Sequence, residues 1–148
     1  MSIAENKKAY FDYHILETFE AGLVLSGPEV KSAKKGEVNL KGAYVILEGT
    51  TAAYLIKAYI APYKPASVYQ RNYDPYQNRQ LLLRRKELKY LFGKSQEPGL
   101  TIVPLKFFLK GGLVKLSLGL ARGKKKFDKR ESIKKREFDR RKKSLIDA

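Results

Sequence analysis

Side chains that could carry out catalysis are few in this chain. His14 is the one histidine and cysteine is absent, so a serine nucleophile would have to use this imidazole as its base. Asp12 and His14 fall on the same face of an expected strand, but a solvated strand face accounts for the pair better than catalysis does. The acidic residues are scattered, without the close spacing that metal ligands need. The sequence therefore predicts no enzyme, no metal site and no cofactor.

Basic side chains, in contrast, are abundant and interleave with aromatic ones. The 148 residues hold 31 Lys and Arg against 15 Asp and Glu, a net charge of +16. Such an excess favours a polyanionic partner, because the cations displace condensed counterions from phosphates. Tyrosine rings can stack on unpaired bases while neighbouring cations hold phosphates, so the pattern predicts RNA binding. The interleaved residues are Tyr10, Tyr13, Tyr63, Tyr69, Tyr73 and Tyr76 with Lys7, Lys8, Lys64, Arg71 and Arg79.

The tyrosines do not all support RNA binding equally. Tyr44, Tyr54 and Tyr59 lie in stretches typical of strands, where tyrosine is an ordinary residue, and we expect them to be structural. For the tyrosines of the loop at 61–77, a structural role and a base-stacking role are both open.

The charge divides the chain into a body at 1–121 and a tail at 122–148. The tail carries 13 Lys and Arg against 5 Asp and Glu, a net charge of +8, which is half of the total excess. Its apolar residues form no helical stripe, and its acid–base pairs four residues apart are worth only a few tenths of a kcal/mol each. Because this falls short of the cost of nucleating a helix, we expect the tail to be disordered when free and helical when bound.

The elements expected in the body are short strands and two or three helices. The expected strands are 9–17, 23–25, 43–48, 53–60, 101–109 and 113–120, with turns at 20–22, 49–51 and 110–112. One helix is expected to begin at Ser26 or Gly27 and end before Gly36, and a second to run from Asp74-Pro75 to about Phe92. This count predicts a mainly β fold: a small closed antiparallel barrel of the oligonucleotide-binding type, with the helices embedded in it.

Short motifs along the whole chain form one ordered set. They include Asp74-Pro75 and Leu81-Leu82-Leu83, and the others lie at residues 6–9, 13–18, 20–22, 29–32, 103–105 and 119–125. This set resembles the SmpB family of tmRNA-binding (SsrA-binding) proteins, from end to end and with very little insertion. Tyr76 and Gln80 depart from the family pattern, where Arg and Lys are common, and Phe127 stands where Tyr or His is frequent.

The resemblance implies a role in trans-translation. A protein of this kind binds the tRNA-like part of tmRNA, which is charged with alanine and bound to elongation factor Tu, and carries it to the vacant A site of a stalled ribosome. The tail then enters the decoding centre and the empty mRNA channel.

The resemblance also implies roles for individual residues. The RNA-binding residues are expected to be Lys7, Tyr13, Glu20, Lys31, Leu82, Arg84 and Lys115. The ribosome-binding residues of the tail are expected to be Lys124, Lys125, Phe127, Asp128, Lys129, Arg130, Leu145 and Ile146. Glu20 is informative because a carboxylate repels phosphate and is expected instead to accept hydrogen bonds from a base edge; the alternative is that it is only a turn residue.

Two other functions are compatible with the same residues. The first is a generic RNA chaperone or ribosomal protein on the same barrel, which would not prefer a tRNA-like elbow over plain single strands. The second, weaker one is a nuclease or RNA-modifying enzyme, which would depend on a metal or cofactor. No stretch approaches the ~20 apolar residues of a membrane span, and the first eight residues do not read as a secretory signal. We therefore expect a cytoplasmic protein without a membrane partner, acting as a monomer.

Overall fold

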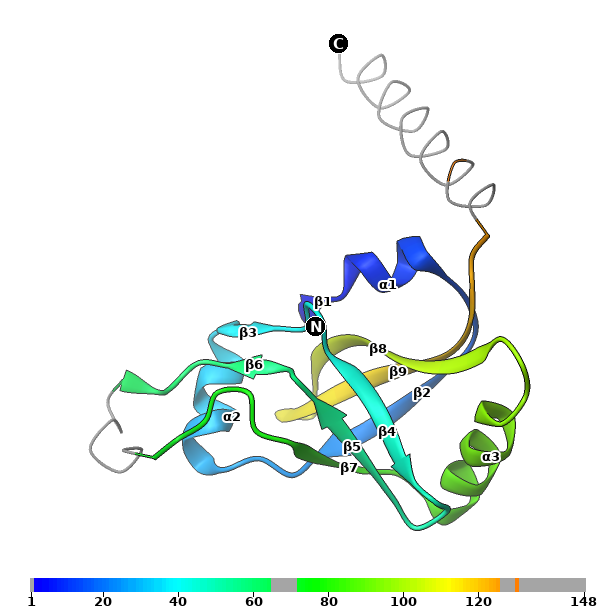
Figure 1. The fold of residues 1–148 in the computed structure, drawn as a ribbon. Helices are drawn as coiled ribbons and strands as arrows, with labels where there is room; N and C mark the ends of the chain where they lie inside the picture. Colours follow the sequence, from blue (N-terminus) through cyan, green and yellow to red (C-terminus); the bar gives the residue numbers. More distant parts are fainter. Residues whose placement is uncertain (1, 65–71, 126–129, 131–148) are drawn as a thin grey trace.

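The computed structural model of the chain describes residues 2–64, 72–125 and 130. In them, nine strands and three helices follow one another along the chain (Figure 1). The strands are β1 (Ser2–Glu5), β2 (Tyr13–Leu23), β3 (Val38–Asn39), β4 (Tyr44–Glu48), β5 (Ala52–Ile56), β6 (Tyr59–Ile60), β7 (Arg79–Leu82), β8 (Leu100–Lys110) and β9 (Leu113–Gly123). The helices are α1 (Lys7–Asp12), α2 (Gly27–Lys34) and α3 (Arg85–Ser95). None of the three combines the length and the apolar composition that a membrane crossing requires.

One antiparallel sheet of seven strands dominates the fold. Its order is β1-β8-β9-β2-β7-β5-β4, and β3 and β6 form a separate two-stranded sheet. The prediction of a mainly β, antiparallel fold with a few helices is confirmed.

The prediction of a closed barrel is wrong. β1 and β4 are the two edges of the sheet, and no hydrogen-bonded pairing joins the edges among the described residues. β4 does approach β8, so the sheet is curled. A cavity of about 290 Å³ lies between them, lined by 45–47 of β4, 100–102 of β8 and Phe92, Ser95 and Gln96 at the end of α3. Side chains at the end of α3 therefore line the gap between β4 and β8, where direct pairing of strands would close a barrel.

Local signals placed two elements correctly. The side chain of Ser26 accepts a hydrogen bond from Glu29 N at 3.3 Å, and Glu29 Oε1 accepts one from Ser26 N at 3.0 Å. This reciprocal cap starts α2, with Pro28 in its first turn, where the missing N–H costs nothing. The β8–β9 hairpin turns at Gly111 and Gly112, whose φ angles of 59° and 77° favour glycine.

Four predicted elements are wrong at their boundaries. The expected strand at 53–60 is divided into β5 and β6, which belong to different sheets. Residues 7–12 form α1, capped by the Asn6 side chain, where the start of a strand was expected. The expected turn at 20–22 lies inside β2, which continues to Leu23. The expected helix from Asp74 to Phe92 is divided: Arg79–Leu82 is strand β7, and α3 begins only after Arg84. Leu81 is buried in the core as a strand residue, so the sheet overrides the helical spacing.

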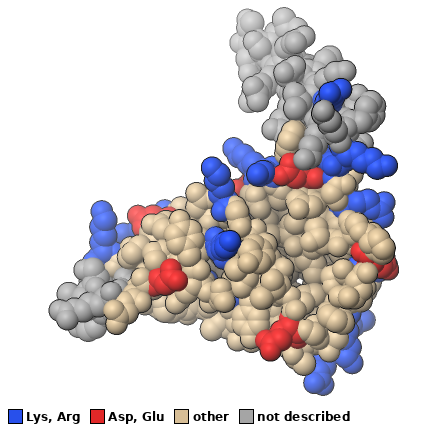
Figure 2. Space-filling model, viewed as in Figure 1, with Lys and Arg blue, Asp and Glu red and all other residues tan. Residues whose placement is uncertain are grey.

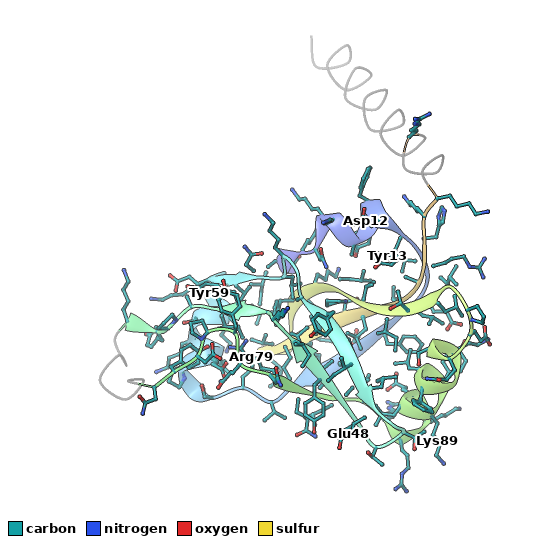
Figure 3. The ribbon with its side chains drawn as sticks, in the orientation of Figure 1. Asp12, Tyr13, Glu48, Tyr59, Arg79 and Lys89 are labelled. Atoms are coloured by element: carbon teal, nitrogen blue, oxygen red, sulfur yellow. The ribbon has the colours of Figure 1, made fainter. Side chains whose placement is uncertain are left out.

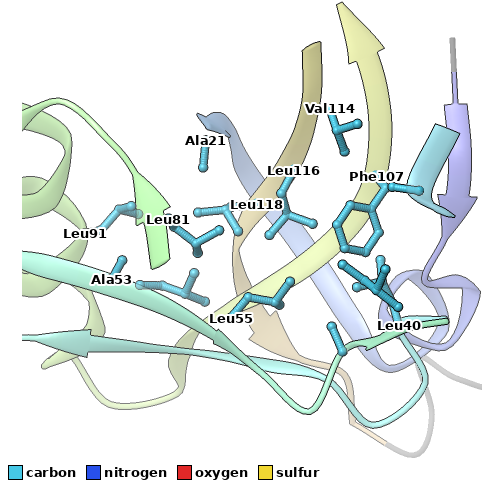
Figure 4. Packing of buried hydrophobic residues seen from close by; sticks show 14 of the residues in the cluster. Ala21, Leu40, Ala53, Leu55, Leu81, Leu91, Phe107, Val114, Leu116 and Leu118 are labelled. Atoms are coloured by element: carbon cyan, nitrogen blue, oxygen red, sulfur yellow. The ribbon is translucent and has the colours of Figure 1, made fainter. Parts of the chain in front are cut away.

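The core fills the concave side of the curled sheet. Figure 4 shows Leu55, Leu81, Phe107, Leu116 and Leu118 packed together; Ala21 of β2 and Ala53 of β5 belong to the same cluster. In β9, the buried residues Leu116, Leu118 and Leu120 alternate with side chains on the opposite side of the sheet. We call that opposite side the outer face.

A second, smaller cluster covers part of the outer face. Ala9 of α1 packs there with Val103, Leu105 and Ala121, and Tyr13 and Ile15 pack against them. Gly119 lies next to this cluster: a Cβ on it would lie 3.0 Å from Leu105 Cδ1 and 3.1 Å from Ile15 Cγ2. α1 thus covers one end of the outer face and leaves the end that carries Lys115 open.

Candidate nucleic-acid interface

An acid–base cluster lies on the open end of the outer face. Glu20 stands opposite Ser117 in the β2–β9 ladder. Its carboxylate accepts hydrogen bonds from Lys110 Nζ at 3.0 and 3.1 Å, and Lys115 Nζ is 3.9 Å away. The hydrogen bond from Lys110 lowers the pKa of Glu20, with help from the charges of both lysines. We call Glu20, Lys110 and Lys115 the Glu20 cluster; all three side chains reach solvent.

An apolar side chain adjoins this cluster. Lys115 is opposite Gly22 in the β2–β9 ladder, and Gly22 is opposite Leu82 of β7. A Cβ on Gly22 would lie 3.3 Å from Leu82 Cβ, so glycine lets the two strands carry Leu82 at this position. Leu82 is 53% exposed although it is a leucine. Together with the neighbouring Glu20, Lys115 and Leu82 offer a carboxylate, a cation and an apolar contact, which suit the base edge, phosphate and base face of an unpaired nucleotide.

A cleft of about 490 Å³ continues the surface toward α3. Its lining residues are Glu17, Thr18, Phe19, Arg84, Lys86, Glu87 and Tyr90. Thr18 is two residues from Glu20 and shares its face of β2, so the cleft adjoins the Glu20 cluster. A hydrogen bond to Glu17 raises the pKa of Tyr90. Arg84 is the N-cap residue of α3 and is exposed, which leaves its guanidinium available to phosphate.

The structure brings together four of the seven predicted RNA-binding residues: Glu20, Leu82, Arg84 and Lys115. The other three lie on other elements. Lys7 begins α1, and Tyr13 is partly buried against the second cluster. Lys31 is on α2, where its ammonium group lies 5.4 Å from the centre of the Tyr63 ring. Glu20 is not a turn residue, since it lies within a strand and is ion-paired.

The described part of the tail begins beside α1. Lys124 N donates a hydrogen bond to Asp12 O at 2.8 Å, so the chain leaves β9 along the end of that helix. Figure 2 shows Lys and Arg gathered where α1 and the end of β9 lie, and others spread around the edge of this view. Lys125 and Arg130 are exposed. Phe127, Asp128, Lys129, Leu145 and Ile146 lie outside the described residues.

A second acid–base cluster is buried inside the molecule. Glu29 Oε2 accepts hydrogen bonds from Arg79 Nε at 2.9 Å and Nη2 at 2.7 Å, with side-chain exposures of 3% and 1%. Gln77 Nε2 adds a third hydrogen bond to the same oxygen at 3.2 Å. Burial opposes the charge on Glu29, but the hydrogen bonds from Ser26, Arg79 and Gln77 outweigh it and hold the pKa of Glu29 below its ordinary value.

Tyr73 completes this buried cluster. Its hydroxyl accepts a hydrogen bond from Arg79 Nη2 at 2.9 Å and lies 2.9 Å from Ile60 O and 3.1 Å from Glu29 Oε2. Burial, together with the charge of Glu29, raises the pKa of Tyr73 to about 12, so the phenol stays neutral. We call Glu29, Arg79 and Tyr73 the Glu29 cluster. Its polar groups are paired with one another and with backbone, so its role is structural.

Sequence reasoning missed several residues of both clusters. Lys110 was assigned to a hairpin turn, and nothing in the sequence pairs it with Glu20, 90 residues away. Tyr90 and Lys86 fall within the helix expected at 74–92, and nothing in the sequence indicated a cleft beside them. The Glu29–Arg79 pair spans 50 residues and has no local signal either. In the described residues, no three acidic or histidine side chains gather as a metal ion would need.

Comparisons with known proteins agree over nearly the full length. The family model described as "SmpB protein" matches residues 3–148. An SsrA-binding protein of Persephonella marina is 51% identical over 138 residues, which cover 93% of this chain and 89% of that protein. One of Burkholderia thailandensis is 48% identical over 146 residues, covering 99% and 97%.

A solved structure extends this agreement to three dimensions. It is described as "tmRNA-SmpB: a journey to the center of the bacterial ribosome", and it aligns with a TM-score of 0.67 and 45% identity over 88% of this chain and 93% of that chain. Because the family match and these identities run through almost every residue, the chain belongs to the SmpB family.

Proposed function

We propose that this chain is a tmRNA-binding protein of trans-translation that rescues stalled ribosomes. It binds the tRNA-like part of tmRNA and carries it, with its alanine and elongation factor Tu, to the A site of the ribosome. It works as a cytoplasmic monomer and catalyses no reaction. The observation that carries the proposal is the full-length match to relatives named for binding SsrA RNA, at about half identity.

The outer face supports this proposal in chemical terms. Lys115 and Arg84 supply cations for phosphates, Leu82 an apolar contact and Glu20 an acceptor for base edges. A loop with unpaired bases, such as the elbow of a tRNA-like RNA, presents all three kinds of partner within a short distance. We further propose that Lys7, Tyr13 and Lys31 contact the flanking backbone, and that the sheet is a partly open variant of the oligonucleotide-binding type.

The tail is assigned a separate task. Of the expected tail at 122–148, Arg122 and Gly123 belong to β9 of the body. The residues that follow β9 form a unit distinct from the body, and they fold into a helix in the decoding centre and the empty mRNA channel. Lys124, Lys125 and Phe127 to Arg130 meet the decoding centre, and Leu145-Ile146 act near the tail end. The high density of Lys and Arg supports a path lined by ribosomal RNA.

Competition binding at fixed salt tests the RNA preference. The tRNA-like part of tmRNA, an ordinary tRNA and an unstructured RNA of equal length compete for the full chain against labelled tmRNA. We expect the tRNA-like part of tmRNA to compete best. Equal competition by all three would instead favour a generic RNA chaperone or ribosomal protein.

A chain that ends after Lys126 tests the task of the tail. It keeps all nine strands and should bind tmRNA with wild-type affinity, because the outer face is intact. It should fail to support peptide tagging on stalled ribosomes. Retained tagging would contradict the proposed role of the tail, and a tail helix in the free chain would contradict folding on binding.

A further inference from the structure

A second surface with RNA-binding chemistry lies away from the outer face, at the small β3–β6 sheet. A cavity of about 280 Å³ opens there, lined by Asn39, Lys41, Tyr59 and Tyr76. In Figure 3, Tyr59 lies at the end of the molecule that holds β3 and β6, and α3 with Lys89 lies at the other end. This cavity is therefore distinct from the cleft beside Arg84.

The two tyrosines form the walls of the cavity. Their ring centres are 5.2 Å apart and their planes are tilted by 52°, so the two rings contact each other as a tilted aromatic pair beside the cavity. Tyr76 is 55% exposed, which leaves much of its ring open to solvent. Tyr59, expected from sequence to be only a strand residue, is the second wall. A planar base can stack on one ring and meet the other at its edge.

The polar lining residues suit the rest of a nucleotide. Lys41 is exposed and supplies an ammonium group for a phosphate. Asn39 Oδ1 accepts a hydrogen bond from Lys41 N at 2.8 Å, which fixes the amide across the turn and leaves its Nδ2 group as a donor. The cavity therefore combines a stacking surface, a cation and a hydrogen-bond donor.

The buried Glu29 cluster holds both walls in place. Arg79 donates to Ala58 O and Tyr73 lies 2.9 Å from Ile60 O, so the cluster binds the backbone on each side of Tyr59. The other wall is tied to the same strand, because Ile60 N donates to Pro75 O at 3.0 Å. Tyr76 N in turn donates to Asp74 Oδ1 at 2.9 Å.

The backbone before Tyr59 is also under constraint. Lys57 has a φ of 61°, in the left-handed region that side chains seldom adopt, where the chain bends from β5 to β6. Such strain persists only where the surrounding structure enforces it. The walls are thus preorganised, so a ligand meets little ordering cost there.

We propose that this cavity binds one unpaired nucleotide of RNA, with its base on Tyr76 and Tyr59 and its phosphate at Lys41. The inference does not depend on which RNA the outer face prefers. It gives the chain two separate contacts for single-stranded nucleotides, one on the outer face of the seven-stranded sheet and one at the β3–β6 sheet.

A fluorescently labelled unstructured RNA hexanucleotide tests the site. Tyr76→Ala should weaken its binding by about tenfold, the effect of losing one stacked base, whereas Tyr76→Phe should bind like the wild type. Lys41→Gln should lower the log–log salt slope by about 0.7, as expected for one phosphate contact. Tyr44→Ala is the matched control, because Tyr44 is 43% exposed on β4 and does not line the cavity. The unfolding midpoints of all variants report whether they are folded.

Nuclear magnetic resonance of ring-labelled tyrosines locates the contact directly. The signals of Tyr59 and Tyr76 should move upfield as the hexanucleotide is added, while the Tyr44 signal stays in place. Unchanged affinity in folded Tyr76→Ala, or an equal loss in Tyr44→Ala, would overturn the proposal. The probe in this experiment is not tmRNA. A negative result would therefore overturn the proposed cavity site without affecting the competition test of the proposed function.

Discussion

The Glu20 cluster and the Glu29 cluster use the same chemistry in opposite surroundings. Each sets a glutamate against basic side chains, with oxygen–nitrogen distances near 3 Å. In the Glu29 cluster the paired side chains are 1% and 3% exposed, and in the Glu20 cluster Lys110 and Glu20 are 60% and 47% exposed. Water screens the exposed pair and can replace either partner, whereas the buried pair has no substitute for a missing partner.

This difference in exposure indicates different roles for the two clusters. The buried carboxylate and guanidinium are saturated by each other, by Tyr73 and by backbone carbonyls, so they fix α2, β6 and β7 relative to one another. The exposed cluster can open, because Lys110 can turn from Glu20 to a phosphate and release the carboxylate to a base edge. A glutamate ion pair is therefore a structural joint in the Glu29 cluster and, in our proposal, part of a binding surface in the Glu20 cluster.

Removing the cation should change protein stability far more in the Glu29 cluster than in the Glu20 cluster, and this is the largest effect that we expect. Arg79→Met leaves Glu29 charged and buried without its partner, which should cost about 3–5 kcal/mol of unfolding free energy. The matched variant Lys110→Met should leave the urea midpoint unchanged, since Glu20 is already hydrated. Urea unfolding at pH 7 measures both. A stable Arg79→Met protein would show that the buried cluster is not a structural joint.

Lowering the pH should destabilise the fold through the buried Glu29 cluster. The folded-state pKa of Glu29 is held below the ordinary value of 4.5, so its ionised form stabilises the fold above that pH. This stability is lost as the pH falls below 4.5 through the lower folded-state pKa. Glu29→Gln should be less stable than wild type at pH 7 and less sensitive to acid. Urea midpoints from pH 7 to pH 3 check this, and a variant that loses stability in parallel with wild type would contradict it.

The smallest effect concerns salt. Binding of tmRNA should weaken with salt, with a log–log slope of several units, because several phosphate contacts release counterions. Lys115→Gln should lower that slope by about one and weaken binding without altering the urea midpoint. Titrations at four salt concentrations measure the slope, and an unchanged slope would remove Lys115 from the phosphate contacts.

The elements that sequence placed correctly are those fixed by neighbouring residues. The cap of α2 needs only Ser26, Pro28 and Glu29, and the β8–β9 turn needs only Gly111 and Gly112. The wrong elements depend on distant partners instead. Gly22 was interpreted as part of a turn, but its lack of a side chain serves the close approach of Leu82, 60 positions away. Leu81 joins β7 because Ala53 and Leu23 lie opposite it in the sheet.

The candidate site was predictable only in part for the same reason. The family resemblance supplied Glu20, Leu82, Arg84 and Lys115, and the structure brings these together. The pairing of Glu20 with Lys110 and the cavity between Tyr59 and Tyr76 arise from strand register and from the Glu29 cluster. Neither leaves a periodic or local pattern in the sequence.

The tmRNA affinity of Glu20→Ala tests the central claim most directly. The substitution raises the net charge of a basic RNA-binding protein, so general electrostatics predicts tighter binding. We predict that binding weakens by about tenfold or more, because a charged acceptor for a base edge is lost, while the urea midpoint stays at the wild-type value. A folded Glu20→Ala protein that binds tmRNA as tightly as wild type, or more tightly, would contradict the account of the Glu20 cluster as a binding surface.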